Sequence, residues 1–497
     1  MKMKTQLTTD DRNLFALVNK ALLSNPFLEK RFELLTKILS RYSKNKKSLG
    51  FKLPEIAPIL NERLDQLEQK GLKRYQEFIN EEDRIIVRNA YLLQIYLRSI
   101  DMLNELIKKQ LSLGKTLVDV PFADEVIAQL KSRGFSGKDS LHYFALFFQL
   151  RRAFYFIDHA LVGDCPSMKK LRLALWNNIF TFDVNIYDQH LWNKMEDFST
   201  IFEGETGTGK GSAAAAIGKC GFIPFDRKKR QFTHNFNETF MTINLSQFPE
   251  SLIESELFGH RKGAFTGAVG HHKGVFERCR AYQSLFLDEI GDITIPVQTK
   301  LLQVIQDRIF TPVGSHRQKR FEGRVIAATN RSITELRKQG HFRSDFYYRL
   351  CSDVITVPTL RQRIKESPSE LEQMVNLLVT RTTGQENQGL ANMILDTLSK
   401  SLPPDYHWPG NVRELEQAVR RILLTHKYDG DPLVCESNFE DDLIQKIQSG
   451  TLETKEFYKQ YCILLYQRFG TYQEVARRTG LDRRTVKKYL MNSIDVE

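Results

Sequence analysis

Residues 200–210 read Thr-Ile-Phe-Glu-Gly-Glu-Thr-Gly-Thr-Gly-Lys, and this stretch decides the fold of the central part of the chain. Its first four residues are expected to form a short strand, and an alanine-rich segment typical of a helix follows Lys210. Glycines between a strand and a helix let backbone N–H groups point at phosphate oxygens, and the lysine reaches the terminal phosphates. The positive end of the helix dipole adds to the attraction. The stretch predicts a phosphate-binding loop, the alternative being a glycine-rich turn.

The residues expected to bind the nucleotide are Gly204, Glu205, Thr206, Gly207, Thr208, Gly209, Lys210 and Gly211. The serine or threonine that usually follows the lysine and binds Mg²⁺ is replaced by Gly211. Ser212 stands one position too far along to take its place. We therefore expect Mg²⁺ to depend on an acidic residue elsewhere in the chain.

Two apolar stretches downstream of the loop end in polar residues. The segment Ser284-Leu-Phe-Leu is followed by Asp288 and Glu289, and Val325-Ile-Ala-Ala-Thr is followed by Asn330. Phosphoryl transfer needs positioning and charge compensation, so we assign Asp288 to Mg²⁺, directly or through water, and Glu289 to the attacking water. Asn330 is expected to sense the γ-phosphate or to orient the water. A surface acidic pair and an Asn that caps a turn are the alternatives.

Arg343 and Arg349 stand six residues apart within the aromatic segment Phe-Arg-Ser-Asp-Phe-Tyr-Tyr-Arg-Leu. A guanidinium in such apolar surroundings usually meets a carboxylate or a phosphate, because it is costly to leave unpaired. Two interpretations remain open. The arginines form salt bridges within the chain, or they complete the active site of a neighbouring subunit.

Gly263-Ala264-Phe265-Thr266-Gly267-Ala268 surrounds one aromatic and one hydroxyl side chain with residues that have little or no side chain. Such a segment buries too little apolar area to form core, and its glycines permit backbone shapes that other residues resist. We interpret it as a mobile loop that displays Phe265 and Thr266. An ordinary glycine turn is the alternative.

The composition is typical of a globular protein, and the net charge favours a polyanionic partner. It has 497 residues, of which 41% are hydrophobic and 27% charged, and its net charge is +12. A positive charge of this size favours a partner such as nucleic acid. No apolar run is long enough to span a membrane, and no signal peptide is evident. Six cysteines are scattered without a CxxC pair, as in a reducing compartment. These features predict a cytoplasmic protein without a membrane partner.

The pattern of the chain predicts a multidomain protein. Residues 1–195 are expected to form an α-helical regulatory domain, since apolar residues between Ile85 and Ile107 recur at helical spacing. Residues 196–360 alternate short strands with helices, which indicates a parallel α/β sheet. A helical lid over 361–430, a linker over 431–455 and an all-α unit over 456–497 are expected to follow. The N-terminal region lacks the pattern of a phosphoacceptor domain, and its ligand is not readable.

The last unit has the pattern helix, tight turn, helix. Val475, Ala476, Leu481, Val486 and Leu490 are expected to face inward, with Gly480 in the turn and Asp482 capping the second helix. That helix is predicted to carry Arg483, Arg484, Thr485, Lys487 and Lys488 on its exposed side. A helix-turn-helix delivers such side chains to the major groove and its phosphates. The prediction is a reader of double-stranded DNA, the alternative being a surface helical hairpin.

Together these motifs resemble the AAA+ ATPase domain of bacterial enhancer-binding proteins, the activators of sigma-54 RNA polymerase. The resemblance covers residues 198–425 and includes Glu254-Ser-Glu-Leu-Phe-Gly259, Leu360-Arg-Gln-Arg363 and Trp408-Pro-Gly-Asn-Val-Arg-Glu-Leu415. The hexapeptide is typical of the members that act on sigma-54, and the C-terminal unit is similar to their Fis-type helix-turn-helix.

The resemblance implies several roles. Phe265 and Thr266 would engage sigma-54 when ATP is bound, and Arg413 would contact the nucleotide as a second sensor. Arg343 and Arg349 would act in trans, which implies a head-to-tail ring, a hexamer or heptamer in this family. The partners are then sigma-54 RNA polymerase holoenzyme and enhancer-like DNA.

Three departures from the family pattern are Gly211, a long segment over 221–237, and Ile-Lys-Glu-Ser-Pro after Arg363. A DNA-binding regulator that uses nucleotide only to control assembly, without sigma-54 contact, is the main alternative function. The intact hexapeptide speaks against it. An unrelated P-loop enzyme, such as a small-molecule kinase, would have no use for the helix-turn-helix.

Overall fold

The computed structural model describes residues 6–42, 53–430, 443, 446–447, 450 and 452–491. The chain divides into two compact units. The first comprises Met1–Leu377 with Gly410–Arg413, and the second comprises Leu378–Pro409 with Glu414–Glu497. Most of the predicted linker over 431–455 lies outside the described residues. Within the described ranges, no helix has both the length and the apolar character needed to cross a membrane.

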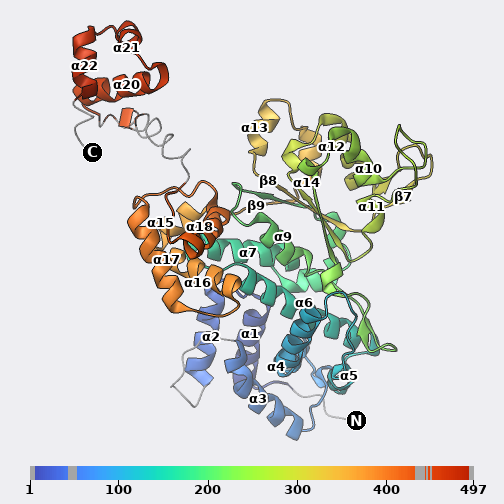
Figure 1. Ribbon diagram of the computed structural model, residues 1–497. Helices are drawn as coiled ribbons and strands as arrows, with labels where there is room; N and C mark the ends of the chain where they lie inside the picture. Colours follow the sequence, from blue (N-terminus) through green and yellow to red (C-terminus); the bar gives the residue numbers. More distant parts are fainter. Residues whose placement is uncertain are drawn as a thin grey trace. The chain divides into compact units, whose positions relative to one another are not determined.

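A five-stranded sheet lies at the centre of the first unit (Figure 1). Its neighbouring strands are all parallel and follow the order β4-β5-β8-β1-β9. The strands are β1 (Thr200–Glu203), β4 (Phe240–Asn244), β5 (Ser284–Asp288), β8 (Arg324–Thr329) and β9 (Asp353–Thr356). The predicted parallel α/β sheet is confirmed. The carboxyl ends of parallel strands share one edge of the sheet, where ligands bind in folds of this class.

The two faces of the sheet enter separate hydrophobic cores, because successive side chains of a strand point to opposite sides. Phe202, Phe286 and Ile326 belong to one core, and Ile201 and Leu285 belong to the other. The second core is covered by short helices and by a small hairpin. These elements are α10 (Glu250–Phe258), α11 (Val275–Arg278), α12 (Ile295–Asp307), α13 (Ile333–Lys338), α14 (Ser344–Leu350), β6 (Ile309–Phe310) and β7 (Lys319–Arg320).

The N-terminal region is helical, as predicted. Its helices are α1 (Thr9–Leu23), α2 (Glu29–Tyr42), α3 (Ala57–Gln69), α4 (Glu81–Ser112), α5 (Ala123–Ser132), α6 (Gly137–Ala160), α7 (Pro166–Phe180) and α8 (Val184–Ile186). The predicted apolar repeat forms the inner side of α4, except for Ile85, which is 45% exposed. The Asn80 side chain caps α4 by accepting from the backbone N–H of Glu82.

The N-terminal helices share the first core with the phosphate-loop helix α9 (Lys210–Gly218). Helices α6 and α7 both pack on α9, as Figure 1 shows. Phe148 on α6 and Leu175 on α7 lie in the same buried cluster as Ala213 on α9. The buried Arg152 guanidinium donates to the carbonyl oxygens of Lys219 and Gly221, at 2.7 and 2.8 Å, where α9 ends. The N-terminal helices are therefore continuous with the core of the sheet.

The long segment over 221–237 forms the antiparallel hairpin β2 (Phe225–Asp226) and β3 (Gln231–Phe232). The Phe232 ring stacks on Phe148 at 4.2 Å between centroids, and Phe225 meets Phe144 edge-on at 4.9 Å. The segment whose role the sequence did not reveal thus attaches the central domain to α6.

Helices α15 (Leu360–Glu366), α16 (Ser369–Thr383), α17 (Gln388–Ser401) and α18 (Asn411–Thr425) follow the sheet, in agreement with the predicted helical lid. The C-terminal residues form α20 (Thr454–Phe469), α21 (Tyr472–Thr479) and α22 (Arg483–Met491). They enclose a small core of their own, made by Cys462, Leu465, Val475, Val486 and Leu490. Ala476 and Leu481 pack against it, so the predicted inward positions are confirmed.

Candidate functional site

The phosphate loop connects β1 to α9 at the carboxyl edge of the sheet. Gly207 and Gly209 have φ values of +79° and +101°, which only glycine adopts without strain. The Lys210 ammonium group folds over the loop and donates to the carbonyl oxygens of Gly204 and Glu205, at 2.8 and 3.0 Å. The Thr208 hydroxyl donates to the Glu205 carbonyl at 2.9 Å. The loop and its lysine therefore form one hydrogen-bonded unit.

The charge of Lys210 is largely removed from water. Burial lowers the pKa of its ammonium group, although the nearby carboxylates of Glu289 and Asp288 act in the opposite direction. A cation in such a site gains more from a bound anion than one on the surface, because less water screens it. The arrangement suits the terminal phosphates of a nucleotide.

The two predicted acids lie where β5 ends. Glu289 adopts a left-handed backbone conformation with φ of +55°, and its N–H donates to Asp288 Oδ1 at 3.1 Å. Burial and the neighbouring Asp288 raise the pKa of Glu289. Strain of this kind is common at functional positions. The Glu289 side chain is half-buried, and its raised pKa makes the carboxylate a stronger base.

Asn330 joins the acids to the phosphate loop. Its backbone N–H lies 3.4 Å from Glu289 Oε2, and its Nδ2 donates to Thr206 Oγ1 at 3.2 Å. Asn330 follows β8, which lies between β1 and β5 in the sheet. The structure thus brings together residues from the ends of three strands, as their order along the edge requires.

Arg413, the predicted second sensor, lies beside the phosphate loop. A Cβ atom placed on Gly207 would lie 2.1 Å from the Gly410 carbonyl oxygen and 3.0 Å from Arg413 Cβ. Gly207 is therefore required by this close approach as well as by its φ. The start of α18 rests directly on the loop.

Two residues that contact the loop were quoted in sequence motifs but received no role there. The Arg361 guanidinium forms a two-point ion pair with Glu205, with Nη1 2.7 Å from Oε2. Asn411 Nδ2 donates to Glu205 Oε2 and to the Thr206 carbonyl oxygen, both at 3.1 Å. The sequence offers no local signal for these contacts, because Arg361 and Asn411 stand 156 and 206 positions after Glu205; only the fold shows that they meet it.

Gly211 is exposed at the start of α9 and offers no hydroxyl group. Among the residues that the structure describes, no group of three or more His, Cys, Asp or Glu side chains is arranged to hold a metal ion. Mg²⁺ keeps several waters and binds through one or two carboxylates together with substrate phosphates. Asp288 alone on the protein side is compatible with that mode of binding.

The two arginines predicted to act in trans differ in their surroundings: Arg343 immediately precedes α14, and Arg349 lies within it. The Arg343 guanidinium pairs with Asp345, with Nη2 2.7 Å from Oδ2, and this pair lowers the pKa of Asp345 to about 2. Arg349 is exposed, and its backbone carbonyl accepts from the Ser199 hydroxyl at 3.0 Å. Both remain on the surface, where a second subunit can reach them.

The hexapeptide lies in the loop between α10 and α11. Gly263 N–H donates to the Ala268 carbonyl oxygen at 2.9 Å, which closes the loop on itself. Thr266 is exposed, as predicted. Phe265 differs from the prediction, because its ring is half-buried and packs edge-on against His260 at 4.9 Å. Of the two side chains, only Thr266 is fully exposed to solvent in this conformation.

Helix α22 carries the predicted basic side chains with one correction. Arg483, Arg484, Lys487 and Lys488 are exposed. Thr485 is half-buried instead, and its hydroxyl donates to Asp482 Oδ2 at 2.5 Å. Asp482 also accepts from the backbone N–H of Thr485 at 3.0 Å. Thr485 belongs to the helix cap, because a threonine three residues after the capping residue points back towards it.

Comparison with known proteins gives matches to both halves of the central region. A family described as "Sigma-54 interaction domain" matches residues 185–356, and one described as "AAA+ ATPase lid domain" matches residues 365–455. The chain is 41% identical over 270 residues to the DNA-binding transcriptional regulator NtrC of Azospirillum brasilense, covering 54% of this chain and 49% of that protein.

Two further relatives match over longer stretches. The nitrogen fixation protein AnfA of Azotobacter vinelandii is 36% identical over 294 residues, which cover 58% of this chain and 51% of that protein. The transcriptional regulatory protein ZraR of Klebsiella oxytoca is 35% identical over 338 residues, 66% of this chain and 67% of that protein. The match spans about half the length of the NtrC and AnfA proteins.

Proposed function

This chain belongs to the sigma-54-dependent enhancer-binding AAA+ activators, and we propose that it couples ATP hydrolysis in a ring to remodelling of the sigma-54 RNA polymerase closed complex. The observation that carries the proposal is the meeting of Lys210, Glu289 and Asn330 at the carboxyl ends of three adjacent strands. The hexapeptide lies in a separate loop between α10 and α11. The phosphate site would therefore hydrolyse ATP, while this loop would contact sigma-54.

ATP is proposed to bind with its phosphates on the backbone N–H groups of residues 204–210. The desolvated Lys210 charge attracts the terminal phosphates, and Arg413 contacts the nucleotide from the start of α18. Bound Mg²⁺ supplies neutralisation of the charge on the phosphate oxygens. Asp288 would hold this ion, and because Gly211 offers no hydroxyl, Asp288 carries more of its binding than usual.

Hydrolysis is proposed to use Glu289 as the residue that polarises the attacking water. Burial and Asp288 raise the pKa of Glu289, and a stronger base takes a proton from water more readily. Asn330 N–H lies beside this carboxylate, and its amide reaches Thr206 of the loop. Asn330 therefore fixes the position of the Glu289 carboxylate relative to the phosphate loop.

Arg343 and Arg349 are proposed to complete the active site of the next subunit in a hexameric or heptameric ring. The exposed Arg349 is available directly, whereas Arg343 must exchange Asp345 for a phosphate. A guanidinium that meets the phosphate in the transition state compensates its developing charge. Head-to-tail contacts of this kind close into a ring.

The hexapeptide is proposed to contact sigma-54, and α22 to bind double-stranded DNA at an enhancer-like site. Thr266 is exposed at the loop tip. Phe265 would have to leave His260 to join it, which gives the loop a retracted and an extended form. The four exposed basic side chains of α22 match the phosphates that flank a major groove.

The experiment that tests the function compares Thr266→Ala with Glu289→Gln in ATPase and sigma-54-dependent open-complex assays. Thr266→Ala should keep ATP hydrolysis and lose activation, since the loop lies outside the phosphate site. Glu289→Gln should bind ATP but turn over at least about 100-fold more slowly, because its amide is no base. Normal open-complex formation by Thr266→Ala would leave an ATP-dependent DNA-binding regulator that has no sigma-54 contact.

Action in trans is tested by mixing Arg349→Ala subunits with Lys210→Ala subunits. Each variant alone should be inactive, because one lacks the finger and the other lacks the phosphate-binding lysine. Mixed rings contain interfaces with an intact Lys210 on one side and an intact Arg349 on the other, so hydrolysis should partly return. Absence of any recovery over all mixing ratios contradicts a finger supplied in trans.

A further inference from the structure

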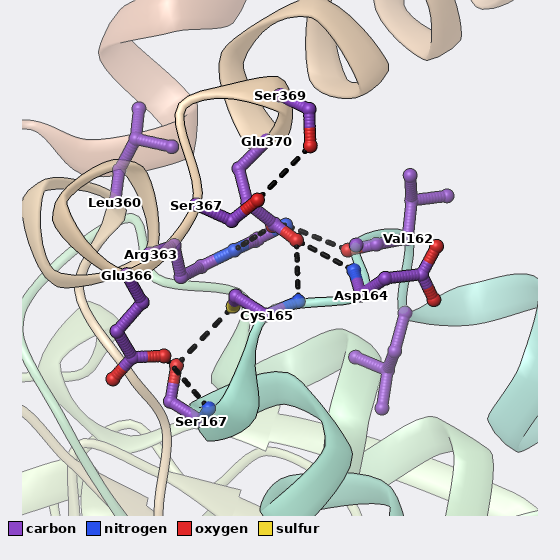
Figure 2. A network of polar contacts seen from close by, with 12 residues as sticks. Val162, Asp164, Cys165, Ser167, Leu360, Arg363, Glu366, Ser367, Ser369 and Glu370 are labelled. Atoms are coloured by element: carbon purple, nitrogen blue, oxygen red, sulfur yellow. Dashed lines mark hydrogen bonds and ion pairs between the residues drawn. The ribbon is translucent and has the colours of Figure 1, made fainter.

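A buried ion pair connects the start of the lid with the N-terminal helices (Figure 2). The Arg363 and Glu370 side chains are 5% and 0% exposed, and Arg363 Nη2 lies 2.8 Å from Glu370 Oε2. Glu370 Oε1 accepts from the backbone N–H groups of Asp164 and Cys165, at 2.5 and 2.8 Å. Arg363 Nη2 donates to the Val162 carbonyl oxygen at 2.6 Å. We call these contacts the 162–165 latch.

Both charges of the latch are compensated by several partners. Glu370 accepts from Arg363 and from two N–H groups, and Arg363 donates to a carboxylate and a carbonyl. A buried charge that loses one such partner is strongly unfavourable. We therefore expect two states of the latch, one in which all of these contacts are formed and one in which all are lost.

The backbone on the N-terminal side is shaped for this contact. Gly163 has φ of +119°, and a Cβ atom there would lie 2.2 Å from Glu370 Oε2 and 2.7 Å from Arg363 Nη2. From behind, the Arg172 side chain of α7 donates to the Leu161 carbonyl oxygen at 2.7 Å. The turn is held on one side by its own helix and on the other by the lid.

The same short helix also holds the phosphate loop. Arg361 and Arg363 stand two residues apart in α15, so their side chains leave the helix roughly 200° apart. Arg361 forms its two-point pair with Glu205 of the phosphate loop, while Arg363 faces the latch. Asn411 strengthens the loop side by accepting from the Leu360 N–H at 2.9 Å and donating to Glu205 at 3.1 Å. Helix α15 thus contacts the phosphate loop through Arg361 and the 162–165 turn through Arg363.

We propose that α15 couples the N-terminal helices to nucleotide binding, with Arg361, Arg363 and Glu370 as positioning residues. This inference rests on the proposed ATPase function and names its regulation. While the latch is closed, α15 is fixed and Arg361 holds Glu205, so the phosphate loop keeps the shape that binds ATP. A signal that moves the 162–165 turn releases α15 and with it the loop.

The test measures the ATP dissociation constant of the full chain by calorimetry. Glu370→Gln removes the counter-charge of Arg363, and Gly163→Ala pushes the turn away without changing the lid. Both should weaken ATP binding by roughly 5- to 150-fold, the range of couplings between linked sites. Glu416→Gln is the matched control, because it makes the same change in the exposed Glu416–Arg420 pair. Its ATP affinity should be that of the wild type.

A double-mutant cycle separates coupling from simple loss of stability. If α15 carries the effect, Arg361→Gln should weaken ATP binding strongly in the wild type and much less in Glu370→Gln, because the loop has already been released. Arg363→Lys, which keeps the charge but loses the forked contacts, gives a milder change in case Glu370→Gln does not fold.

The results distinguish failure of the proposed function from failure of the coupling alone. A wild-type chain that binds no ATP contradicts the proposed function and, with it, the coupling. A wild-type chain that binds ATP, with folded latch variants that bind it equally well, overturns the coupling alone. Additive losses in the double-mutant cycle also overturn it, since independent sites give additive effects.

Discussion

Helices flank the ATPase sheet in sequence on both sides, but the two flanks are built differently. The N-terminal helices share one core with α9 and the sheet, and this core includes Leu175, Ala213 and Phe202. The C-terminal helices α20, α21 and α22 have a core of their own, which includes Leu465 and Val475. A helical sequence pattern does not separate the two cases, because both flanks are helical.

This difference between a shared and a separate core predicts which group of helices can alter nucleotide binding and hydrolysis. A shared core transmits strain, because side chains pack as densely as in an organic crystal and cannot yield independently. The N-terminal region adds polar contacts to this core, at the end of α9 through Arg152 and at α15 through the 162–165 latch. We expect signals on this side to alter the nucleotide site directly, whereas the proposed role of helices α20, α21 and α22 is to bind DNA.

The largest expected effect comes from deleting one flank at a time. A chain without residues 1–195 should aggregate or fail to fold, since α9 and the 221–237 hairpin would expose a large apolar face. A chain without residues 452–497 should stay folded and bind ATP with unchanged affinity, while DNA binding is lost. Soluble yield, light scattering and calorimetry measure these outcomes. If the chain without residues 1–195 is monodisperse and binds ATP, the N-terminal helices are not needed to complete the core of the sheet.

A smaller effect is expected from the same substitution in each core. Leu175 is 0% exposed and Leu465 is 6% exposed. Truncating a buried leucine to alanine costs about 2–5 kcal/mol. Leu175→Ala should lower the thermal transition that ATP stabilises, because that transition includes the sheet. Leu465→Ala should leave this transition in place and weaken DNA binding, as followed by differential scanning calorimetry with and without ATP. Equal shifts in the ATP-stabilised transition would show that the two cores unfold together.

The local structure around residues 200–218 could be predicted from the sequence because its determinants are local. The strand, loop and helix over 200–218 follow from turn chemistry and periodicity, and parallel strands bring Asp288 and Asn330 to the same edge. The contacts of Arg361 and Glu370 were not predicted. They join residues more than 150 positions apart, and no local pattern shows which carboxylate a given arginine meets.

The errors have a common origin. Phe265 and Thr485 were assigned to exposed surfaces from their place in a motif, but each found a partner nearby, the His260 ring and the Asp482 carboxylate. A one-dimensional pattern gives the helix or loop and its general face. It does not show which neighbours compete for a side chain within a few ångströms.

The smallest expected effect comes from removing one helix cap on each flank. Ser136 Oγ accepts from the Asp139 N–H at the start of α6, and Thr471 Oγ1 does so from the Glu474 N–H at the start of α21. Loss of such a cap costs about 1 kcal/mol in either place. The shift in transition temperature is that cost divided by the entropy of unfolding, which grows with the size of the cooperative unit. Ser136→Ala should therefore shift the large ATP-stabilised transition by about 2 °C or less, and Thr471→Ala should shift a separate C-terminal transition by more than roughly 8 °C. If Thr471→Ala moves the ATP-stabilised transition as far as Ser136→Ala does, the C-terminal helices unfold with the ATPase and are not an independent unit.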